Sequence, residues 1–128
     1  MKTYPFSALL SRMKYITRWS LMRSTRAESL SEHTADTALL AHTLCLIGQK
    51  CTVTGKSLRP EVVATAALYH DAPEILTGDL PTPVKYKNDA LRTAYKAVEH
   101  EGARVMASLQ PAELQAETQA WLTGSLLN

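Results

Sequence analysis

The stretch Leu68–Glu74, LYHDAPE, ends one predicted helix and begins the next. Pro73 disfavours helical geometry at the residue before it, Ala72, so we expect the first of these helices to end near His70. Neighbouring side chains inside a helix point about 100° apart and do not normally reach one ion, but a helix end relaxes that restriction. The stretch therefore predicts a helix end at which the side chains of His70 and Asp71 both turn inward.

His70 and Asp71 combine an imidazole with a carboxylate, and a further histidine, His33, lies upstream. This pair of groups suits borderline divalent ions such as manganese, cobalt, nickel or zinc, whereas an all-oxygen site favours magnesium or calcium. A single helical histidine is more often a packed or surface residue than a ligand. Taken together, however, the three residues predict most of a divalent-metal site.

Asp71 also fits a purely structural role. Asp71 and Glu74 have the spacing of a capping box at the start of a new helix, with Pro73 in its first turn. That role leaves both histidines unexplained, and it can coexist with metal binding.

Two further residues of the predicted helix around His33 bear on the ligand set. Asp36 lies on nearly the same helical face as His33, so it could be another ligand or orient the ring, although an exposed acid is the commoner role. His42, nine residues after His33, turns to the opposite face and is not expected to share the ion.

Composition predicts one cytoplasmic domain. The chain has 128 residues, 45% hydrophobic and 20% charged, which suffices for a core without disulfides or a structural metal. It offers neither the roughly 18 consecutive apolar residues of a membrane span nor, at residues 1–5, the pattern of a secretory signal. Cys45 and Cys51 fit neither a redox pair nor a zinc knuckle, so we expect reduced thiols, with Cys45 in the core.

Charge is distributed unevenly. Residues 1–27 hold six Lys or Arg and no acid, while the net charge of +2 is too small to argue for a nucleic acid polymer. The basic group could steer a phosphorylated ligand or be a solvated face. Arg18 beside Trp19 could form a phosphate fork next to a flat apolar wall, or be ordinary packing. Lys85, in a proline-rich loop, could offer a second phosphate cation or be a solvated lysine.

Helical periodicity runs through almost the whole chain, and no alternating strand stands out, so we predict an all-α fold of about five to six helices. The first predicted helix is short, with an apolar stripe of Phe6, Leu9, Leu10 and Met13. The second follows a capping box at Ser29–Glu32 and runs from Leu30 to about Ile47, with a stop near Gly48 and an apolar stripe of Ala38, Ala41, Leu44 and Cys45. The others run from Pro60 to His70, from Ala72 to about Thr77 and from about Asp89 to Leu109, and Pro111 opens the last one.

These residues, taken in order, resemble the HD-domain phosphohydrolase superfamily, whose signature is one His, then His-Asp, then a distant Asp, all on helices. The resemblance is greatest to its bacterial 5′-deoxynucleotidases, and it implies an HD-domain helical bundle, usually dimeric. It also implies a divalent metal, with cobalt, manganese or copper as activators, and removal of phosphate from deoxyribonucleoside 5′-monophosphates by metal-activated water. The matching segments are Leu10–Arg12, Arg18–Trp19, Ser31–His33, Tyr69–Ala72, Glu74 and Thr77–Tyr86.

The resemblance implies roles for particular residues. It makes His33, His70 and Asp71 the metal ligands, Arg18 a phosphate contact and Trp19 a wall that disfavours a ribose 2′-hydroxyl.

Two carboxylates become candidates for proton transfer, Glu74 ahead of Asp79. Asp79 follows a glycine, where an acid often holds its own loop through backbone hydrogen bonds instead. Lys85 stays a candidate for substrate binding, and we expect the partners to be the nucleotide and a second copy of the chain, with no nucleic acid polymer and no membrane.

One feature departs from the family pattern. The family's fourth ligand is an Asp on a later helix, and no Asp follows Asp89 here. We therefore expect residues 1–128 to be a single HD-type domain without the C-terminal part that carries that Asp. Three protein ligands and a water can still form a catalytic site. The alternatives are a hydrolase of another nucleotide phosphoester, or a catalytically degenerate module for nucleotide binding or dimerisation.

Overall fold

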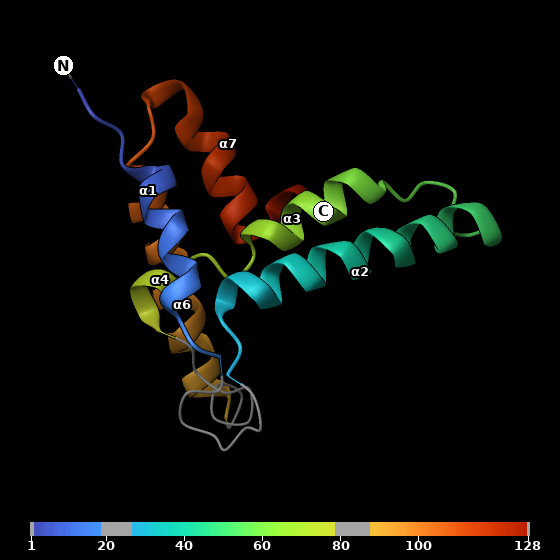
Figure 1. Cartoon of the computed structure of the whole chain (residues 1–128), viewed down its shortest axis with the longest axis horizontal. Coiled ribbons are helices and arrows are strands. Elements are labelled where there is room, and N and C mark those ends of the chain that lie inside the picture. Colours follow the sequence, from blue (N-terminus) through green and yellow to red (C-terminus); the bar gives the residue numbers. More distant parts are fainter. Residues whose placement is uncertain (1, 19–26, 79–87, 128) are drawn as a thin grey trace.

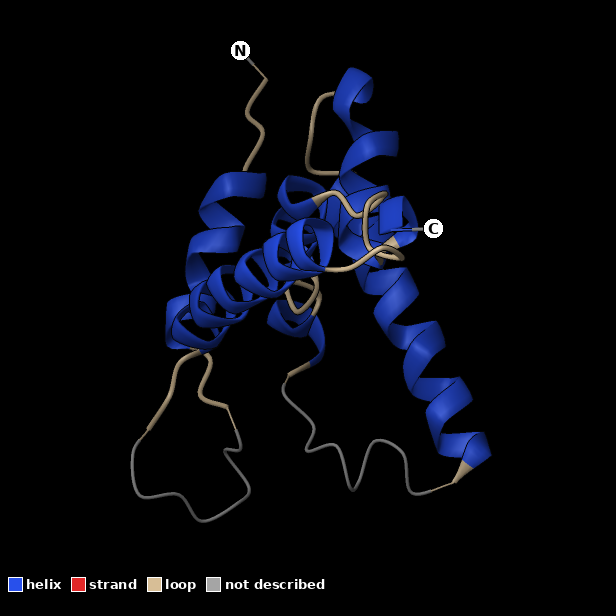
Figure 2. Ribbon diagram, turned by 90° about the vertical axis from the view of Figure 1, so that its right-hand side faces the viewer, coloured by secondary structure: helices blue, strands red, loops and turns tan. Residues whose placement is uncertain are grey.

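The computed structural model describes residues 2–18, 27–78 and 88–127, and helices dominate these ranges (Figures 1 and 2). They contain no β-strand, and an isolated antiparallel bridge pairs Thr17 with Ser29. No helix among the described residues is long and apolar enough to cross a membrane. The all-α prediction is confirmed. The elements are α1 (Phe6–Leu10), the 3-10 helix η1 (Ser11–Tyr15), α2 (Leu30–Cys51), α3 (Pro60–Tyr69), α4 (Glu74–Thr77), α6 (Asp89–Ala107), α7 (Ala112–Thr123) and the 3-10 helix η2 (Ser125–Leu127).

Helix α2 begins where the capping box predicted. The Ser29 hydroxyl accepts from the backbone N–H of Glu32 at 3.1 Å, and the Glu32 carboxylate accepts from the backbone N–H of Ser29 at 3.2 Å. The predicted stop near Gly48 is wrong, because α2 continues to Cys51. Gly48 instead makes room for the returning chain, since a Cβ there would lie 2.7 Å from the Leu58 side chain.

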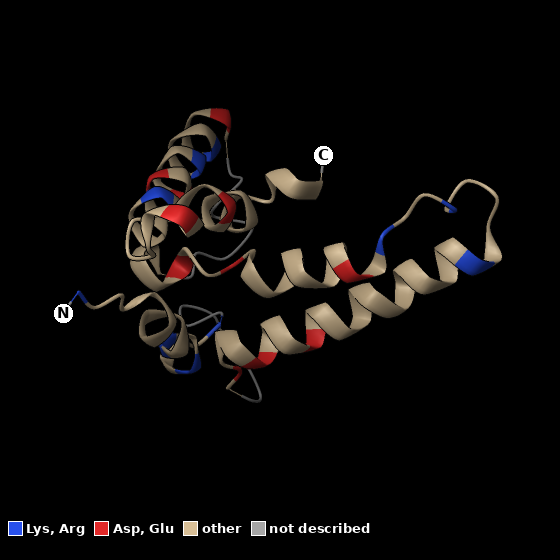
Figure 3. Cartoon of the chain, turned by 90° about the horizontal axis from the view of Figure 1, so that it is seen from above, with Lys and Arg blue, Asp and Glu red and all other residues tan. Residues whose placement is uncertain are grey.

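Helices α2 and α3 form a hairpin that projects from the rest of the molecule (Figures 1 and 3). Only the first part of α2 is buried, at Leu30, Thr34 and Ala38. The predicted apolar stripe is therefore wrong at its far end, where Leu44 is exposed and Cys45 half-buried. The reason is that this part of α2 extends beyond the core of the protein.

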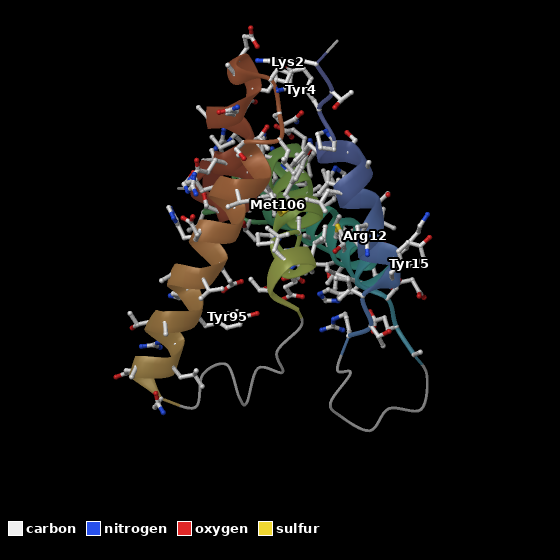
Figure 4. All side chains as sticks on the ribbon, turned by 90° about the vertical axis from the view of Figure 1, so that its left-hand side faces the viewer. Lys2, Tyr4, Arg12, Tyr15, Tyr95 and Met106 are labelled. Atoms are coloured by element: carbon white, nitrogen blue, oxygen red, sulfur yellow. The ribbon has the colours of Figure 1, made fainter. Side chains whose placement is uncertain are left out.

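The core lies where α1, η1, α4, α6, α7 and the near ends of α2 and α3 meet. Met106, fully buried on α6, lies inside this group of helices (Figure 4). Ala72 is also fully buried there, and the Tyr69 ring stacks on that of Trp121 with centroids 6.3 Å apart. The two residues that flank His70 and Asp71 in sequence are thus both held by packing. The core cluster comprises Phe6, Met13, Leu30, Ala72, Ala103, Met106 and Leu122.

Three other helix boundaries differ slightly from prediction. Helix α4 begins at Glu74 and not at Ala72. Pro111 is the N-cap of α7 and not its first helical residue, and α6 ends at Ala107, before Leu109. Pro60 opens α3 as predicted, and α3 ends at Tyr69, with His70 as its C-cap.

Candidate metal centre

Three side chains predicted from sequence to be ligands meet at one point. The Nε2 atom of His70 lies 2.9 Å from an Asp71 carboxylate oxygen, and the Nε2 atom of His33 lies 3.4 Å from the same oxygen. One ligand atom from each residue lies within 4.8 Å of the others. His33 comes from the first turns of α2, and the other two come from the end of α3.

Backbone turns after α3 explain how adjacent residues face the same point. The Ala72 N–H donates to the Tyr69 carbonyl and the Glu74 N–H to the Asp71 carbonyl, each at 3.0 Å. The N-cap of α4 is Pro73, so the capping-box role considered for Asp71 is wrong. The Asp71 carboxylate is directed toward the two imidazoles instead.

The donor set fits a divalent ion. The Nδ1 atom of His70 lies 2.6 Å from the Ala67 carbonyl, which can only accept, so Nδ1 carries the proton and Nε2 keeps its lone pair for a metal. Metal–ligand bonds of about 2.0–2.2 Å place neighbouring ligand atoms roughly 3 to 3.5 Å apart. The separations of Asp71 from both histidines lie in or next to this range.

The two histidines differ in proton affinity. The hydrogen bond with the Asp71 carboxylate is the main reason that the pKa of His70 is raised above its ordinary value. Burial is the main reason that the pKa of His33 is lowered, and the positive charge of Arg18 lowers it further. His33 therefore favours the neutral, ligating form.

Arg18 reaches this site from the chain segment before α2. Its Nη1 atom lies 3.3 Å from one carboxylate oxygen of Glu28, and the other oxygen of Glu28 lies 3.7 Å from Nδ1 of His33. Sequence reasoning did not single out Glu28. Its position is distinctive, because Glu28 is the first acid after the basic segment 1–27 and directly precedes the capping residue Ser29, but this position does not indicate which side chains it contacts.

The remaining predicted residues divide into two groups. Glu74, at the start of α4, is buried with 3% of its surface exposed, and after Asp71 it adds to the electrostatic rise in the pKa of His70. Trp19, Asp79 and Lys85 lie outside the described residues.

Asp36 and His42 do not belong to the ligand cluster within the described part of the chain, and Asp36 is exposed.

His70 also borders a cavity of about 360 Å³ between the end of α3 and helices α6 and α7. With 41% of its side chain exposed, His70 is the most accessible member of the cluster. The candidate metal centre is therefore open to solvent on this side. The other lining residues are Pro73, Lys96, Glu99, His100, Leu122 and Thr123.

Comparison with known proteins gives several matches. A 5′-deoxynucleotidase of Vibrio parahaemolyticus is 47% identical over 117 residues, which cover 91% of this chain and 59% of the relative. The 5′-deoxynucleotidase YfbR of Salmonella paratyphi B is 48% identical over 115 residues, which cover 90% of this chain and 57% of the relative. The chain thus spans less than two thirds of the length of these curated relatives.

A solved structure shares the fold. The crystal structure of an HD-domain phosphohydrolase from Listeria innocua superposes with a TM-score of 0.75 at 24% identity, over 91% of this chain and 55% of that one. The profile of the family described as 5′-deoxynucleotidase YfbR-like matches residues 5–127. With a match over nearly its whole length, and with His33, His70 and Asp71 gathered at one point, the chain belongs to the 5′-deoxynucleotidase YfbR-like family.

Proposed function

We propose that this protein is a metal-dependent phosphohydrolase that removes phosphate from deoxyribonucleoside 5′-monophosphates. The observation that carries the proposal is the gathering of His33, His70 and Asp71, with the guanidinium of Arg18 held near them through Glu28. The relatives named above are 5′-deoxynucleotidases, which supports the choice of substrate.

His33, His70 and Asp71 would hold the metal ion. Two nitrogen donors and one carboxylate favour a borderline ion, so we propose cobalt or manganese first, with copper, nickel or zinc as other occupants. When bound, such an ion supplies Lewis-acid chemistry, lowering the pKa of a water molecule and offsetting phosphate charge. Three protein ligands leave a position for that water.

Arg18 would bind the phosphate. A guanidinium presents a planar fork of N–H donors that matches phosphate oxygens, and it balances charge on the phosphoryl group in the transition state. One edge of this fork, at Nη1, faces Glu28. We keep Trp19 as the wall against a ribose 2′-hydroxyl and Lys85 as a second substrate contact, on the sequence resemblance alone.

Glu74 would move the proton. Its buried carboxyl group lies at the start of α4, one turn of chain after Asp71, and a positioned carboxyl near the reacting group is a suitable acid or base. Asp79 is the second candidate, again from the sequence resemblance.

We further propose that residues 1–128 form one HD-type domain that acts in the cytoplasm as a homodimer. Exposed apolar side chains along α2 support the dimer, since such surfaces commonly mark contacts between proteins.

The test is phosphate release from dAMP and AMP, with cobalt or manganese and with a chelator. We expect metal-stimulated release from dAMP in preference to AMP, and its loss in His70→Ala. The control is His42→Ala, which removes a half-buried histidine of α2 outside the ligand cluster and should leave the activity within about twofold.

Other results would favour the alternatives. Turnover of another nucleotide with none of dAMP would indicate a different phosphohydrolase. Binding of dAMP in chelator without any metal-stimulated release would indicate a degenerate binding module.

A further inference from the structure

Glu28 lies between a proposed phosphate contact and a proposed metal ligand. One of its carboxylate oxygens faces Nη1 of Arg18 at 3.3 Å, and the other faces Nδ1 of His33 at 3.7 Å. The second separation is an ion-pair distance and not a hydrogen bond. All three side chains are partly buried, with exposed fractions of 22%, 33% and 23% for Arg18, Glu28 and His33. Solvent therefore screens these contacts only in part.

The backbone around Glu28 is tied at two points. The Arg18 N–H donates to the Glu28 carbonyl at 2.8 Å, and the Leu30 N–H donates to the Ile16 carbonyl at 2.7 Å. These bonds form the antiparallel bridge between Thr17 and Ser29. Arg18 and Glu28 are therefore paired by the main chain as well as by their side chains.

The same bridge is continuous with the helix that carries His33. Ser29 is the N-cap of α2, with the capping box to Glu32, and its carbonyl accepts from the His33 N–H at 3.1 Å. A short, fully hydrogen-bonded path thus runs from the backbone of Arg18 to the backbone of His33. With the backbone fixed in this way, only the Arg18 guanidinium and the His33 imidazole remain to be oriented.

The carboxylate of Glu28 can orient both of these groups. Toward Arg18 it takes one edge of the guanidinium, which fixes the plane of the fork. Toward His33, whose Nδ1 atom also has the Thr37 hydroxyl at 3.5 Å, the negative charge of Glu28 favours the tautomer with the proton on Nδ1. Nε2, the atom facing Asp71, then keeps its lone pair. A carboxylate behind a ligating histidine commonly raises metal affinity in this way.

We propose that Glu28 is a positioning residue that sets the Arg18 guanidinium and the His33 imidazole relative to each other. The guanidinium and the metal ion held by His33 would then act on the same phosphoryl group. This inference rests on the proposed function, because it assigns Arg18 to phosphate and His33 to metal.

The test compares Glu28→Gln with wild type and with Asp36→Asn. Asp36 is an exposed acid on α2, so its amide variant makes the same change in charge and shape away from the cluster. The readouts are the Co²⁺ dissociation constant, followed by absorbance or calorimetry, and kcat and KM for dAMP. Glu28→Gln should weaken Co²⁺ binding and lower kcat/KM about 10-fold each, whereas Asp36→Asn should change each by less than about twofold.

A double-mutant comparison separates positioning from general destabilisation. If Glu28 acts through Arg18, Glu28→Gln should lower kcat/KM for dAMP, measured at saturating Co²⁺, much less in an Arg18→Ala background than in wild type. Its effect on Co²⁺ affinity should persist there, because that effect passes through His33. Equal losses of kcat/KM in both backgrounds would overturn the part of the inference that concerns Arg18.

The outcomes distinguish this inference from the proposed function. Turnover of dAMP by wild type, with Glu28→Gln equal to Asp36→Asn in both readouts, overturns the role of Glu28 and leaves the function standing. Absence of dAMP turnover in wild type defeats the function and with it the role of Glu28 toward Arg18. Co²⁺ affinity then decides the part of the inference that concerns His33: a 10-fold loss in Glu28→Gln supports it, and no loss overturns it. Wild type that binds no Co²⁺ overturns both. If circular dichroism shows Glu28→Gln unfolded, Glu28→Asp replaces it, with a smaller loss expected in the same two readouts.

Discussion

Two hydrogen bonds, one at each ring nitrogen, fix the orientation of the His70 imidazole in the cluster. Nδ1 donates to the Ala67 carbonyl at 2.6 Å, and Nε2 faces the Asp71 carboxylate at 2.9 Å. Without a metal, the carboxylate favours a protonated imidazole. A metal ion competes with that proton for Nε2, so binding of metal should release it.

The first prediction concerns the titration of these histidines in the metal-free protein. His70 should lose its proton at higher pH than His33, because its pKa is raised mainly by the hydrogen bond to Asp71, while that of His33 is lowered mainly by burial. Protonated His70 therefore stabilises the fold below about pH 6.5, and this contribution is lost as pH rises through its raised pKa. NMR titration of the ring protons measures both values.

Asp71→Asn is the control for this titration, since it removes the main cause of the raised pKa. The pKa of His70 should fall in this variant. A higher pKa for His33 than for His70 in wild type would contradict this prediction.

The second prediction concerns Glu74. Glu74→Gln should lower kcat about 10²-fold or more, because the amide cannot exchange a proton, while Co²⁺ affinity stays within about threefold of wild type. Glu61→Gln is the matched control, since Glu61 occupies the first turn of α3 as Glu74 does that of α4, but is exposed. Phosphate-release kinetics at saturating dAMP measure the effect. An unchanged kcat would exclude Glu74 as the proton-transfer group.

Sequence reasoning singled out the three residues that the structure brings together as a candidate metal cluster, but not their surroundings. His33, His70 and Asp71 could be predicted because their side chains carry the chemistry and Pro73 indicates a helix end. Glu28 could not be assigned a role in the same way. Its contacts with Arg18 and His33 depend on an antiparallel bridge between two short segments, which leaves no periodic pattern in the sequence.

Helix starts were easier to predict than helix ends. The capping box at Ser29 and the proline at position 60 act locally, so each identified the start of its helix. Gly48 suggested an end to α2, yet the helix continues to Cys51, and Leu58 of the chain that returns to α3 lies close to that glycine. A glycine selected by such a tertiary contact cannot be distinguished by sequence from one that stops a helix.

The third prediction uses a glycine that lacks such a close contact. Gly102 is buried on α6, and a Cβ there would meet Pro73 and Thr77 near α4 at 3.8–3.9 Å, which is ordinary contact. Gly102→Ala should therefore raise the free energy of unfolding by about 0.5–1 kcal/mol, through helix propensity and a less flexible unfolded chain. Urea denaturation measures the change.

Gly124→Ala provides the opposite case. Gly124 has φ of +76°, a conformation that side chains with a Cβ rarely adopt, so its substitution should lower stability by about 1 kcal/mol. Destabilisation by Gly102→Ala would mean that α4 and α6 approach more closely than the structure shows.

The hairpin of α2 and α3 gives the molecule its extended shape, and it leaves apolar surface uncovered. Leu40, Leu44 and Ile47 expose 60%, 58% and 52% of their surface, and their spacing places them along one side of α2. Figure 3 shows few charged residues along the middle of this helix. A surface of this kind favours association, and a second copy of the chain is the partner that we propose.

The last prediction tests that association. Leu44→Glu should raise the dissociation constant of the dimer at least 10-fold, because a carboxylate buried at the interface would have to lose its hydration without a partner. Leu114→Glu is the control, since Leu114 is similarly exposed but lies in the first turn of α7 and not on the hairpin. Sedimentation velocity over a range of concentrations measures both variants. A wild-type protein that stays monomeric at the highest attainable concentration would contradict the homodimer. The candidate metal centre, built from residues of a single chain, would be unaffected.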